Sequence, residues 1–270
     1  MKVSIVTISY NQARFLEKAI MSVLDQDYHD VEYIVVDPGS TDGSRDIIDR
    51  YRSRLTQVLF ETDAGPADGL NKGFKLGTGD IYGFINSDDY LLPGTISHIV
   101  DFFERHPNID VVSGHGYYVD EHERILRGVY SHRIAQKSFA YGSVVLLQQS
   151  TFFRRQTFEQ VGGFNVQNPI SWDGELWADM LKNKAKFARI HKYLSAFRIY
   201  RTSLTGSQIN RQIFDREMKR IQMKMGIKKP NLFLGRMYWF MNRITDPVLL
   251  RMQIINGLQY GFSSPIPKQK

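Results

Sequence analysis

Two adjacent carboxylates, Asp88 and Asp89, follow directly after the short apolar run Ile81 to Ile85. Such a run is typical of a buried strand, so both side chains are expected at the end of that strand. Adjacent anions repel each other and raise a pKa unless a cation neutralises them. A hard divalent cation binds through one or two carboxylates together with substrate phosphates. The pair therefore predicts a metal site, and capping of a helix opened by Pro93 is the structural alternative.

A third carboxylate, Asp37, ends the strand-like run Tyr33 to Val36 and precedes Pro38 and Gly39. Aspartate is common in turns of this composition because its side chain bonds to nearby backbone amides. The functional alternative is an acceptor for a hydrogen bond from a nucleobase or ribose. Asp37 taken alone leaves both interpretations open.

The elements that must position these carboxylates alternate regularly along the first 108 residues. Strand-like runs alternate with apolar residues at helical spacing, and Pro66 suits the first turn of a helix. This order predicts βαβ units, a mostly parallel sheet flanked by helices, and ligands at the carboxyl ends of the strands. The expected strands are Val3 to Ile8, Tyr33 to Val36, Val58 to Phe60 and Ile81 to Ile85, and the expected helices are Gln12 to Gln26, a helix reaching Tyr51, Pro66 to Leu76 and one opened by Pro93.

The pattern changes after about residue 108. We expect a β-hairpin from Val111 to Val119 and Arg124 to Tyr130, and a helix from Trp172 to Leu181. Two short strands are expected at Ala188 to Ile190 and Ala196 to Tyr200, followed by a basic helical segment from Gln208 onward.

Composition excludes several classes of protein. The chain has 270 residues, 42% hydrophobic and 23% charged, and no cysteine, so it is expected to fold without disulfides or a cysteine metal site. A Walker A loop, a dinucleotide-binding glycine pattern and a nucleophile elbow are all absent from the sequence. No apolar stretch is long enough to span a bilayer and no signal peptide is evident, so a cytoplasmic location is expected.

Charge divides the chain into two unequal parts. Residues 1–188 carry a net charge of −6, and residues 189–270 carry +13. A basic tail of this kind predicts an anionic partner. Within residues 231–262, aromatic and aliphatic residues are interleaved with Arg236, Arg243 and Arg251, which suits a helix on an anionic membrane surface. Packing against the rest of the protein, or against a second subunit in a homo-oligomer, is the equal alternative.

Five ordered segments resemble family 2 glycosyltransferases, and the resemblance covers about residues 2–205. They read SIVTISYN from Ser4, SVLDQDY from Ser22, IVVDPGSTDGS from Ile34, DAGPADGLNKG from Asp63 with GDI from Gly79, and NSDD from Asn86. Pro38 stands where Asp or Gly is usual in the family, and Asn86 stands where Asp is commoner. A sixth segment, SWDGELW from Ser171, is similar to the acidic motif on the acceptor side of these enzymes.

The resemblance implies a GT-A fold with catalytic residues 1–205 and a basic helical extension at 206–270. Residues 1–108 would bind the nucleotide-sugar donor, most typically a UDP-sugar, and residues 109–205 would bind the acceptor. It implies an inverting, metal-dependent transferase that uses Mn²⁺ or Mg²⁺. Family members often build surface polysaccharides such as O-antigen, capsule or exopolysaccharide, so a glycan or lipid-linked glycan acceptor is expected. The protein is then expected to act at the inner face of the cell membrane.

The resemblance also implies roles for individual residues. Asp173 matches the general base, with helix capping as its structural alternative and Glu175 as a second candidate. Asp89 would be the main metal ligand, and Asp88 would share the metal or face the ribose. Tyr200 stands where many relatives carry His, so Arg198 or Arg201 would meet the diphosphate instead. The remaining donor-binding candidates are Ser9, Tyr10, Asp37, Asp68 and Lys72.

Two other functions stay open at this stage. A sugar-nucleotide pyrophosphorylase is also a metal-dependent α/β enzyme, but the segment Tyr10 to Arg14 lacks the glycine-rich loop of that class. A non-enzymatic nucleic-acid binder could use the basic tail, but no recognition motif is present and the acidic first part fits poorly. We therefore expect no nucleic-acid partner.

Overall fold

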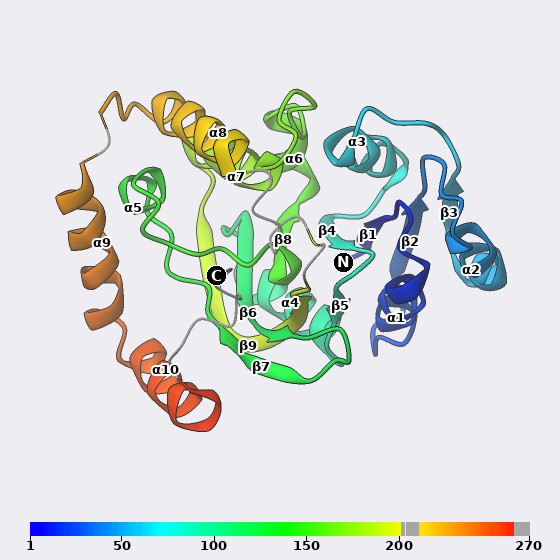
Figure 1. The fold of residues 1–270 in the computed structure, drawn as a ribbon, viewed down its shortest axis with the longest axis horizontal. Helices are drawn as coiled ribbons and strands as arrows, with labels where there is room; N and C mark the ends of the chain where they lie inside the picture. Colours follow the sequence, from blue (N-terminus) through cyan, green and yellow to red (C-terminus); the bar gives the residue numbers. More distant parts are fainter. Residues whose placement is uncertain (201–202, 204–210, 230, 262–270) are drawn as a thin grey trace.

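A nine-stranded mixed sheet with helices on both faces forms the centre of the described structure (Figure 1). The computed structural model describes residues 1–200, 203, 211–229 and 231–261. Strands follow the spatial order β3-β2-β1-β4-β8-β6-β9-β5, and β7 pairs with β6 outside this path. The expected boundary between residues 205 and 206 lies outside the described residues.

The first part of the sheet is entirely parallel, as the strand–helix alternation predicts. β1 lies between β2 and β4, and Ile8 at its end is level with Val36 of β2 and Asn86 of β4. The three strand ends therefore meet at one edge of the sheet. The elements of this part are β1 Val3–Ile8, α1 Ala13–Leu24, β2 Val31–Val36, α2 Ser44–Tyr51, β3 Gln57–Leu59, α3 Pro66–Leu76, β4 Ile81–Asn86 and α4 Thr95–Arg105. The short strand β5 Tyr90–Leu91 follows β4 in the chain but pairs antiparallel with the strand Phe187–Arg198 at the other end of the sheet.

Both faces of these strands are buried, which explains why their sequences are continuously apolar. Residues Tyr33 and Val35 of β2 pack in one core cluster with Leu16 of α1 and residues of α4. The alternate residues Ile34 and Val36 pack in a second cluster with residues of α3 and α7 (Trp172–Lys182). The period of two along the strand therefore assigns each side chain to one of the two helical layers.

The second part of the sheet is mixed. β8 pairs antiparallel with β4 and β6, β7 forms the expected hairpin with β6, and β6 runs parallel to β9. The two short strands predicted near residues 188 and 196 are wrong, because Phe187–Arg198 is one strand, β9, whose register against β6 shifts around His115. The elements are β6 Val111–Val119, β7 Ile125–Val129, α5 Gln136–Ala140, β8 Thr151–Arg154, α6 Arg155–Gln160, α7 and β9.

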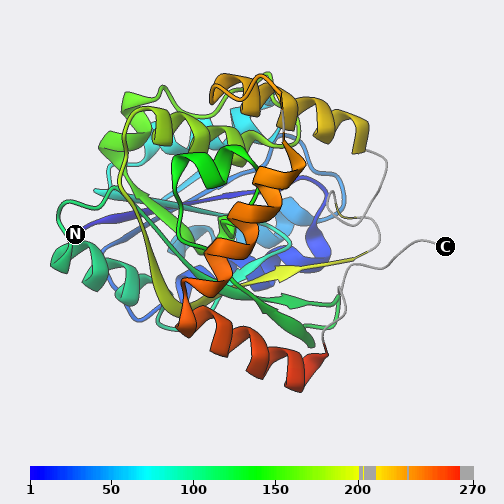
Figure 2. The same cartoon turned by 90° about the vertical axis from the view of Figure 1, so that its left-hand side faces the viewer.

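Three helices follow along the side of the molecule opposite β3 and α2 (Figures 1 and 2): α8 Arg211–Lys224, α9 Leu232–Ile244 and α10 Pro247–Tyr260. A buried ion pair between Arg189 of β9 and Asp246, the N-cap residue of α10, ties α10 to the sheet. No helix in the described part of the chain has the length and apolarity that crossing a bilayer requires.

Beside that ion pair lie two buried histidines whose ionisation is suppressed. Burial, with His191 and Arg189 nearby, lowers the pKa of His115 to about 3. Burial, with Arg243 and Arg189 nearby, lowers the pKa of His132 to about 4. Asp246 opposes both shifts. Both imidazoles are therefore neutral in the folded protein at neutral pH.

These histidines predict a loss of stability in acid. The unfolded chain has a histidine pKa near 6.5, so below that value it binds more protons than the folded state, and stability falls as the pH falls. The expected loss is about 2 kcal/mol per histidine between pH 7.5 and pH 5.0. Urea unfolding at both pH values tests this, and the His115→Gln variant should lose about 2 kcal/mol of the acid dependence. An unchanged dependence in the variant would contradict the assignment.

Candidate active site

Three buried oxygen atoms without a protein partner lie at neighbouring strand ends. They are Oγ of Ser9, Oδ2 of Asp37 and Oδ1 of Asn86, and none has a hydrogen bond from any described residue. Ser9 follows β1, Asp37 follows β2 and Asn86 ends β4, and these three strands are adjacent. Buried acceptors without a donor cost free energy. Such a group of acceptors at the carboxyl edge of a parallel sheet indicates a ligand site.

Asp37 is held rigidly by one of its two carboxylate oxygens. Oδ1 accepts hydrogen bonds from the backbone N–H groups of Gly39 at 3.1 Å and Ser40 at 2.8 Å, and from Nε of Arg45 at 3.1 Å. The guanidinium of Arg45 also stacks on Phe60, 4.5 Å from the ring centroid. The turn interpretation of Asp37 therefore describes Oδ1, while Oδ2 is left for a donor from outside the protein.

The loop after β1 is pinned to the loop after β2. Asn11 adopts a left-handed conformation with φ of 52°. Its N–H donates to Oγ of Ser40 at 2.8 Å, and its Oδ1 accepts from the N–H of Thr41 at 2.9 Å. The neighbouring Tyr10 side chain is 61% exposed. The loop after β1 thus carries an exposed aromatic side chain next to Ser9.

Asp88 is half-buried and hydrogen-bonded to a distant tyrosine. Its Oδ2 accepts from the Tyr200 hydroxyl at 3.0 Å, and that hydroxyl in turn accepts from Nε2 of Gln12 at 3.3 Å. Burial raises the pKa of Asp88. Burial and the Asp88 carboxylate raise the pKa of Tyr200, so the phenol stays protonated and donates. The second oxygen of Asp88 has no donor among the described residues, which suits a carboxylate that meets a cation.

Asp89 differs from Asp88 in that both of its oxygens are already in use. Oδ1 accepts from the backbone N–H of Arg198 at 2.8 Å, and Oδ2 accepts from Nε2 of Gln149 at 2.6 Å. The residue is 1% exposed, and burial followed by the neighbouring Asp88 raises its pKa well above the ordinary value. This geometry makes Asp89 a tie to β9 and leaves Asp88 as the more accessible carboxylate of the pair. Neither residue caps α4, whose N-cap is Gly94.

The structure does not favour Arg198 as a diphosphate ligand. Its side chain is 1% exposed, and it donates from Nε to the Asp88 carbonyl at 2.9 Å and from Nη1 to the Asp120 carbonyl at 3.0 Å. The guanidinium also lies over Phe15, 4.5 Å from the ring centroid. Arg198 therefore braces the chain around Asp88. Arg201 lies outside the described residues.

Asp68 and Lys72 of α3 hold the loop that follows β3. Nζ of Lys72 donates to the Thr62 carbonyl at 2.6 Å and lies 3.1 Å from Oδ2 of Asp68. The same Asp68 oxygen accepts from the Ala64 N–H at 3.0 Å, and this bond lowers the pKa of Asp68. Their side chains remain 25% and 30% exposed. Both side chains already have partners in the protein, and both remain accessible to a bound nucleotide-sugar.

Asp173 lies in the first turn of α7 with a largely uncommitted carboxylate. Ser171 occupies the N-cap position, and the hydrogen bond that Asp173 makes is from the Gly174 N–H at 2.7 Å. Burial raises the pKa of Asp173. The preceding Trp172 packs against Phe84 of β4, with ring centroids 5.5 Å apart. This packing brings the start of α7 to the end of β4, where Asn86 and Asp88 lie.

Glu175, the second candidate base, is a buried anchor for α8. Its carboxylate, 1% exposed, accepts from Arg220, from Nζ of Lys224 at 3.1 Å, and from the amides of Asn165 and Asn168. Burial by itself would raise its pKa, but these donors outweigh burial and lower the pKa to about 2. A carboxylate so fully bonded is a poor base, so the structure does not support this role.

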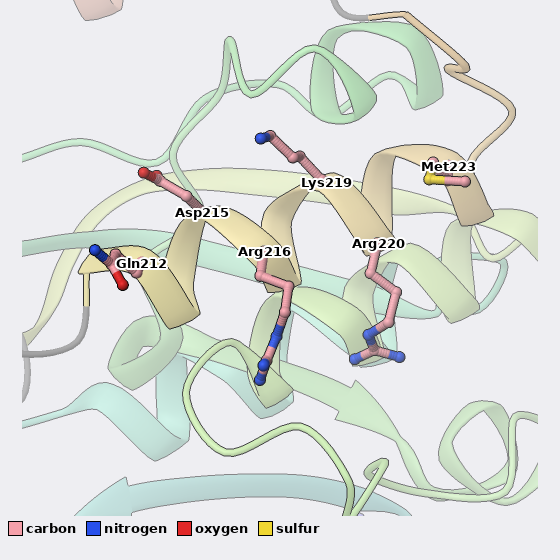
Figure 3. A pocket seen from close by; sticks show the side chains of 6 residues that line it. All are labelled: Gln212, Asp215, Arg216, Lys219, Arg220 and Met223. Atoms are coloured by element: carbon pink, nitrogen blue, oxygen red, sulfur yellow. The ribbon is translucent and has the colours of Figure 1, made fainter.

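A hollow of about 590 Å³ lies along α8 (Figure 3). Arg216 and Arg220 extend from one side of the helix, while Asp215 and Lys219 extend from the other. The residues that line this hollow all belong to α8, so it is separate from the site at the strand ends.

Sequence analysis missed Gln12, Gln149 and the fixed orientation of Asp37. Gln149 lies in a short 3₁₀ turn before β8 and contacts Asp89 only because β8 pairs with β4. No local pattern marks it. Gln12 directly follows the SIVTISYN segment, so its place beside a predicted strand end was the one available signal.

Comparison with known proteins identifies relatives across most of the chain. The family model described as "Glycosyl transferase family 2" matches residues 4–162. An uncharacterized glycosyltransferase of Nostoc sp. is 29% identical over 197 residues, which cover 66% of this chain and 57% of the relative. The Escherichia coli protein WfaP, named a UDP-Glc:alpha-D-GlcNAc-diphosphoundecaprenol beta-1,3-glucosyltransferase, is 24% identical over 89% of this chain and 93% of its own length. The chain spans 57% and 30% of the first two curated relatives.

Solved structures show the same fold at low identity. Residues 1–349 of Staphylococcus aureus TarS align with a TM-score of 0.67 and 20% identity, covering 97% of this chain and 76% of that one. The mannosyltransferase PcManGT from Pyrobaculum calidifontis, solved with GDP-Man and Mn²⁺, aligns with a TM-score of 0.63 and 18% identity, covering 98% and 81%. The arrangement of sheet and helices is therefore shared with both.

Proposed function

Because this chain belongs to glycosyltransferase family 2 and has the GT-A fold, we propose that it transfers a sugar from a nucleoside-diphosphate sugar to an acceptor hydroxyl, with inversion, during surface polysaccharide synthesis. The observation that carries the proposal is the row of unpartnered acceptors on Ser9, Asp37 and Asn86 beside the half-buried carboxylate of Asp88. We place the reaction in the cytoplasm.

The donor nucleotide is proposed to bind at the ends of β1 and β2. Oδ2 of Asp37 accepts a hydrogen bond from an N–H of the base, and the exposed Tyr10 ring stacks on that base. Ser9 contributes a second polar group, and Asp68 and Lys72 border the site. WfaP, which acts on UDP-Glc, and the TarS crystal structures with UDP and UDP-GlcNAc support uridine as the base.

A divalent cation, Mn²⁺ or Mg²⁺, fits the strand ends because Asp88 offers a partly buried carboxylate with one oxygen free of protein donors. A hard divalent cation of this kind is commonly held by one or two carboxylates together with substrate phosphates. Asp88 would hold it, with Asn86 beside it. When bound, the cation neutralises charge that develops on the departing diphosphate.

Asp173 is proposed as the general base. Its carboxylate accepts the proton of the acceptor hydroxyl while the acceptor oxygen forms a bond to the anomeric carbon, and the bond from that carbon to the diphosphate oxygen breaks. Burial outweighs the opposing hydrogen bond from the Gly174 N–H and leaves the carboxylate more basic than an ordinary aspartate. A base with a raised pKa takes a proton more readily in the transition state.

The acceptor is proposed to be a glycan or a lipid-linked glycan, which the name of WfaP supports. A pyrophosphorylase and a nucleic-acid binder have no supporting contact in the described structure, and membership of the transferase family counts against both.

The donor assignment is tested by thermal-shift titration with nucleoside diphosphates and Mn²⁺. UDP should raise the melting temperature most. The Asp37→Asn change keeps Oδ1 with its three donors but replaces the accepting Oδ2 with a donating amide, so UDP affinity should fall about 10- to 100-fold. Asp101→Asn, on the exposed face of α4, is the matched control and should bind as the native protein does. Native UDP affinity in Asp37→Asn would remove Asp37 from the site.

A further inference from the structure

The last helix, α10, is held to the sheet along one side. The Tyr130 hydroxyl donates to the Met252 carbonyl at 3.0 Å, and Oδ1 of Asn256 accepts from the Gly128 N–H at 2.7 Å. Leu249 on the same side is fully buried. With the ion pair of Asp246, these contacts set the rotation of α10 about its axis and therefore determine which side faces outward.

The outward side of α10 is also apolar. Its large side chains are between 41% and 77% exposed, namely Val248, Leu250, Ile254, Ile255 and Leu258. In an α-helix at 100° per residue these positions share one half of the surface. A helix that is apolar all round is normally buried on every side, so this outer side lacks a cover in the described structure.

The preceding helix, α9, has the same two-sided arrangement. Its inner side contacts the loop after α5, where the ring of Tyr238 stacks on Tyr141 at 5.6 Å and the Gly235 carbonyl accepts from Ser143 at 2.8 Å. The outer side exposes large apolar residues by 39% to 86%: Leu232, Phe233, Met237, Trp239, Phe240, Met241 and Ile244. Figure 2 shows α9 and α10 on the same side of the molecule.

Charge on this outer face has a single sign. Arg236 and Arg251 are exposed among the apolar residues. Arg243 is half-buried, its guanidinium lies 3.5 Å from the Trp239 ring centroid, and it is close to His132 on the inner side. The acidic residue in the described segment 231–261 is Asp246, which is buried and paired with Arg189. The face therefore combines apolar side chains with uncompensated positive charge.

We propose that the outer face of α9 and α10 lies on an anionic phospholipid surface, with the apolar side chains at the level of the lipid head groups. Aromatic and aliphatic residues on one side of a helix, flanked by arginine, suit this position. Each arginine near an anionic bilayer contributes about a five-fold gain in binding. A hollow of about 640 Å³ between α9 and residues 141–143, lined in part by Arg236, Trp239 and Phe240, offers further room for a lipid group.

A second copy of the chain fits this face less well. A two-fold interface brings the same surface of both subunits together. Here it would bury two arginines from each side with no acidic partner on the face, and buried unpaired charge is costly. An anionic lipid supplies the missing negative charge.

Flotation with vesicles tests the proposal independently of the transferase reaction. The native protein should float with vesicles of equal phosphatidylglycerol and phosphatidylcholine and float weakly with phosphatidylcholine alone. The variant carrying Arg236→Gln and Arg251→Gln should lose about 25-fold in affinity for the anionic vesicles. A variant carrying Lys75→Gln and Lys182→Gln removes equal charge from other exposed positions and should float as the native protein does.

A second variant, with Phe233→Ser and Phe240→Ser, changes only exposed positions and should also lose vesicle binding. Native flotation in either the arginine or the phenylalanine variant overturns the proposal. So does light scattering that finds a native dimer which the phenylalanine variant converts to a monomer. The UDP thermal shift, measured on every variant, should not change, so failure of the docking surface and failure of the donor site give different results.

Discussion

Turnover in the Asp173→Asn variant should fall by about 10²- to 10⁴-fold, the usual contribution of a general base, while UDP binding stays native. The amide keeps the size of the carboxylate and can still accept from the Gly174 N–H, so α7 should form normally. What it cannot do is take a proton from the acceptor hydroxyl. Steady-state sugar transfer and UDP thermal shift, measured together, separate the two effects.

The pH profile gives a second readout for Asp173. Because burial raises its pKa, the carboxylate is protonated and inactive in acid, and turnover should rise with pH until the group is ionised. Asp173→Asn should lose this rise. Glu175→Gln is the matched control: it weakens the bonds to Arg220 and Lys224, so the protein should be less stable, but turnover of the folded protein should persist. Full turnover in Asp173→Asn together with inactive, folded Glu175→Gln would exchange the two roles.

Asp88 and Asp89 should respond in opposite ways to substitution. Asp88→Asn removes the carboxylate that is proposed to hold the cation, so the Mn²⁺-dependent part of donor binding should disappear while stability without ligand changes little. Asp89→Ala leaves the Arg198 N–H and the Gln149 amide without acceptors in a buried place, which should lower the free energy of unfolding by about 3 kcal/mol. UDP titration with and without Mn²⁺, alongside urea unfolding, measures both effects.

The reverse pattern would restore Asp89 as the principal ligand. In that case Asp89→Ala would keep its stability and lose the Mn²⁺ effect, and Asp88→Asn would keep it. Because the two residues are adjacent in sequence, this pair of variants controls for position, and only the direction in which each side chain points differs between them.

The elements of the parallel part were predictable because their signals are local. α3 runs from Pro66 to Leu76, as predicted, since apolar spacing and a proline at the first helical position are read from neighbouring residues. The four strands are also where the apolar runs indicate. The sheet edge at which Asp37, Asp88 and Asp89 meet follows from the parallel order of these strands.

The prediction of two short strands was wrong because the pairing that joins them into one strand is not a local signal. The middle of β9, around His191 and Lys192, is exposed and polar, which resembles a loop in sequence. It continues as a strand because β6 pairs with it on both sides of the irregularity near His115. Pairing with a strand more than seventy residues away outweighs the local preference.

By itself, then, the sequence determined the strand–helix order, the edge at which the acidic residues gather, and the family to which the motifs point. Only the tertiary structure decided which oxygen atoms are free. Asp88 and Asp89 are indistinguishable as a dipeptide, but Arg198 and Gln149 occupy the oxygens of Asp89, while Tyr200 leaves one oxygen of Asp88 open. These partners lie 60 to 112 residues away. Periodicity reports which face a residue takes within its own element, whereas hydrogen-bond partners depend on how distant elements pack.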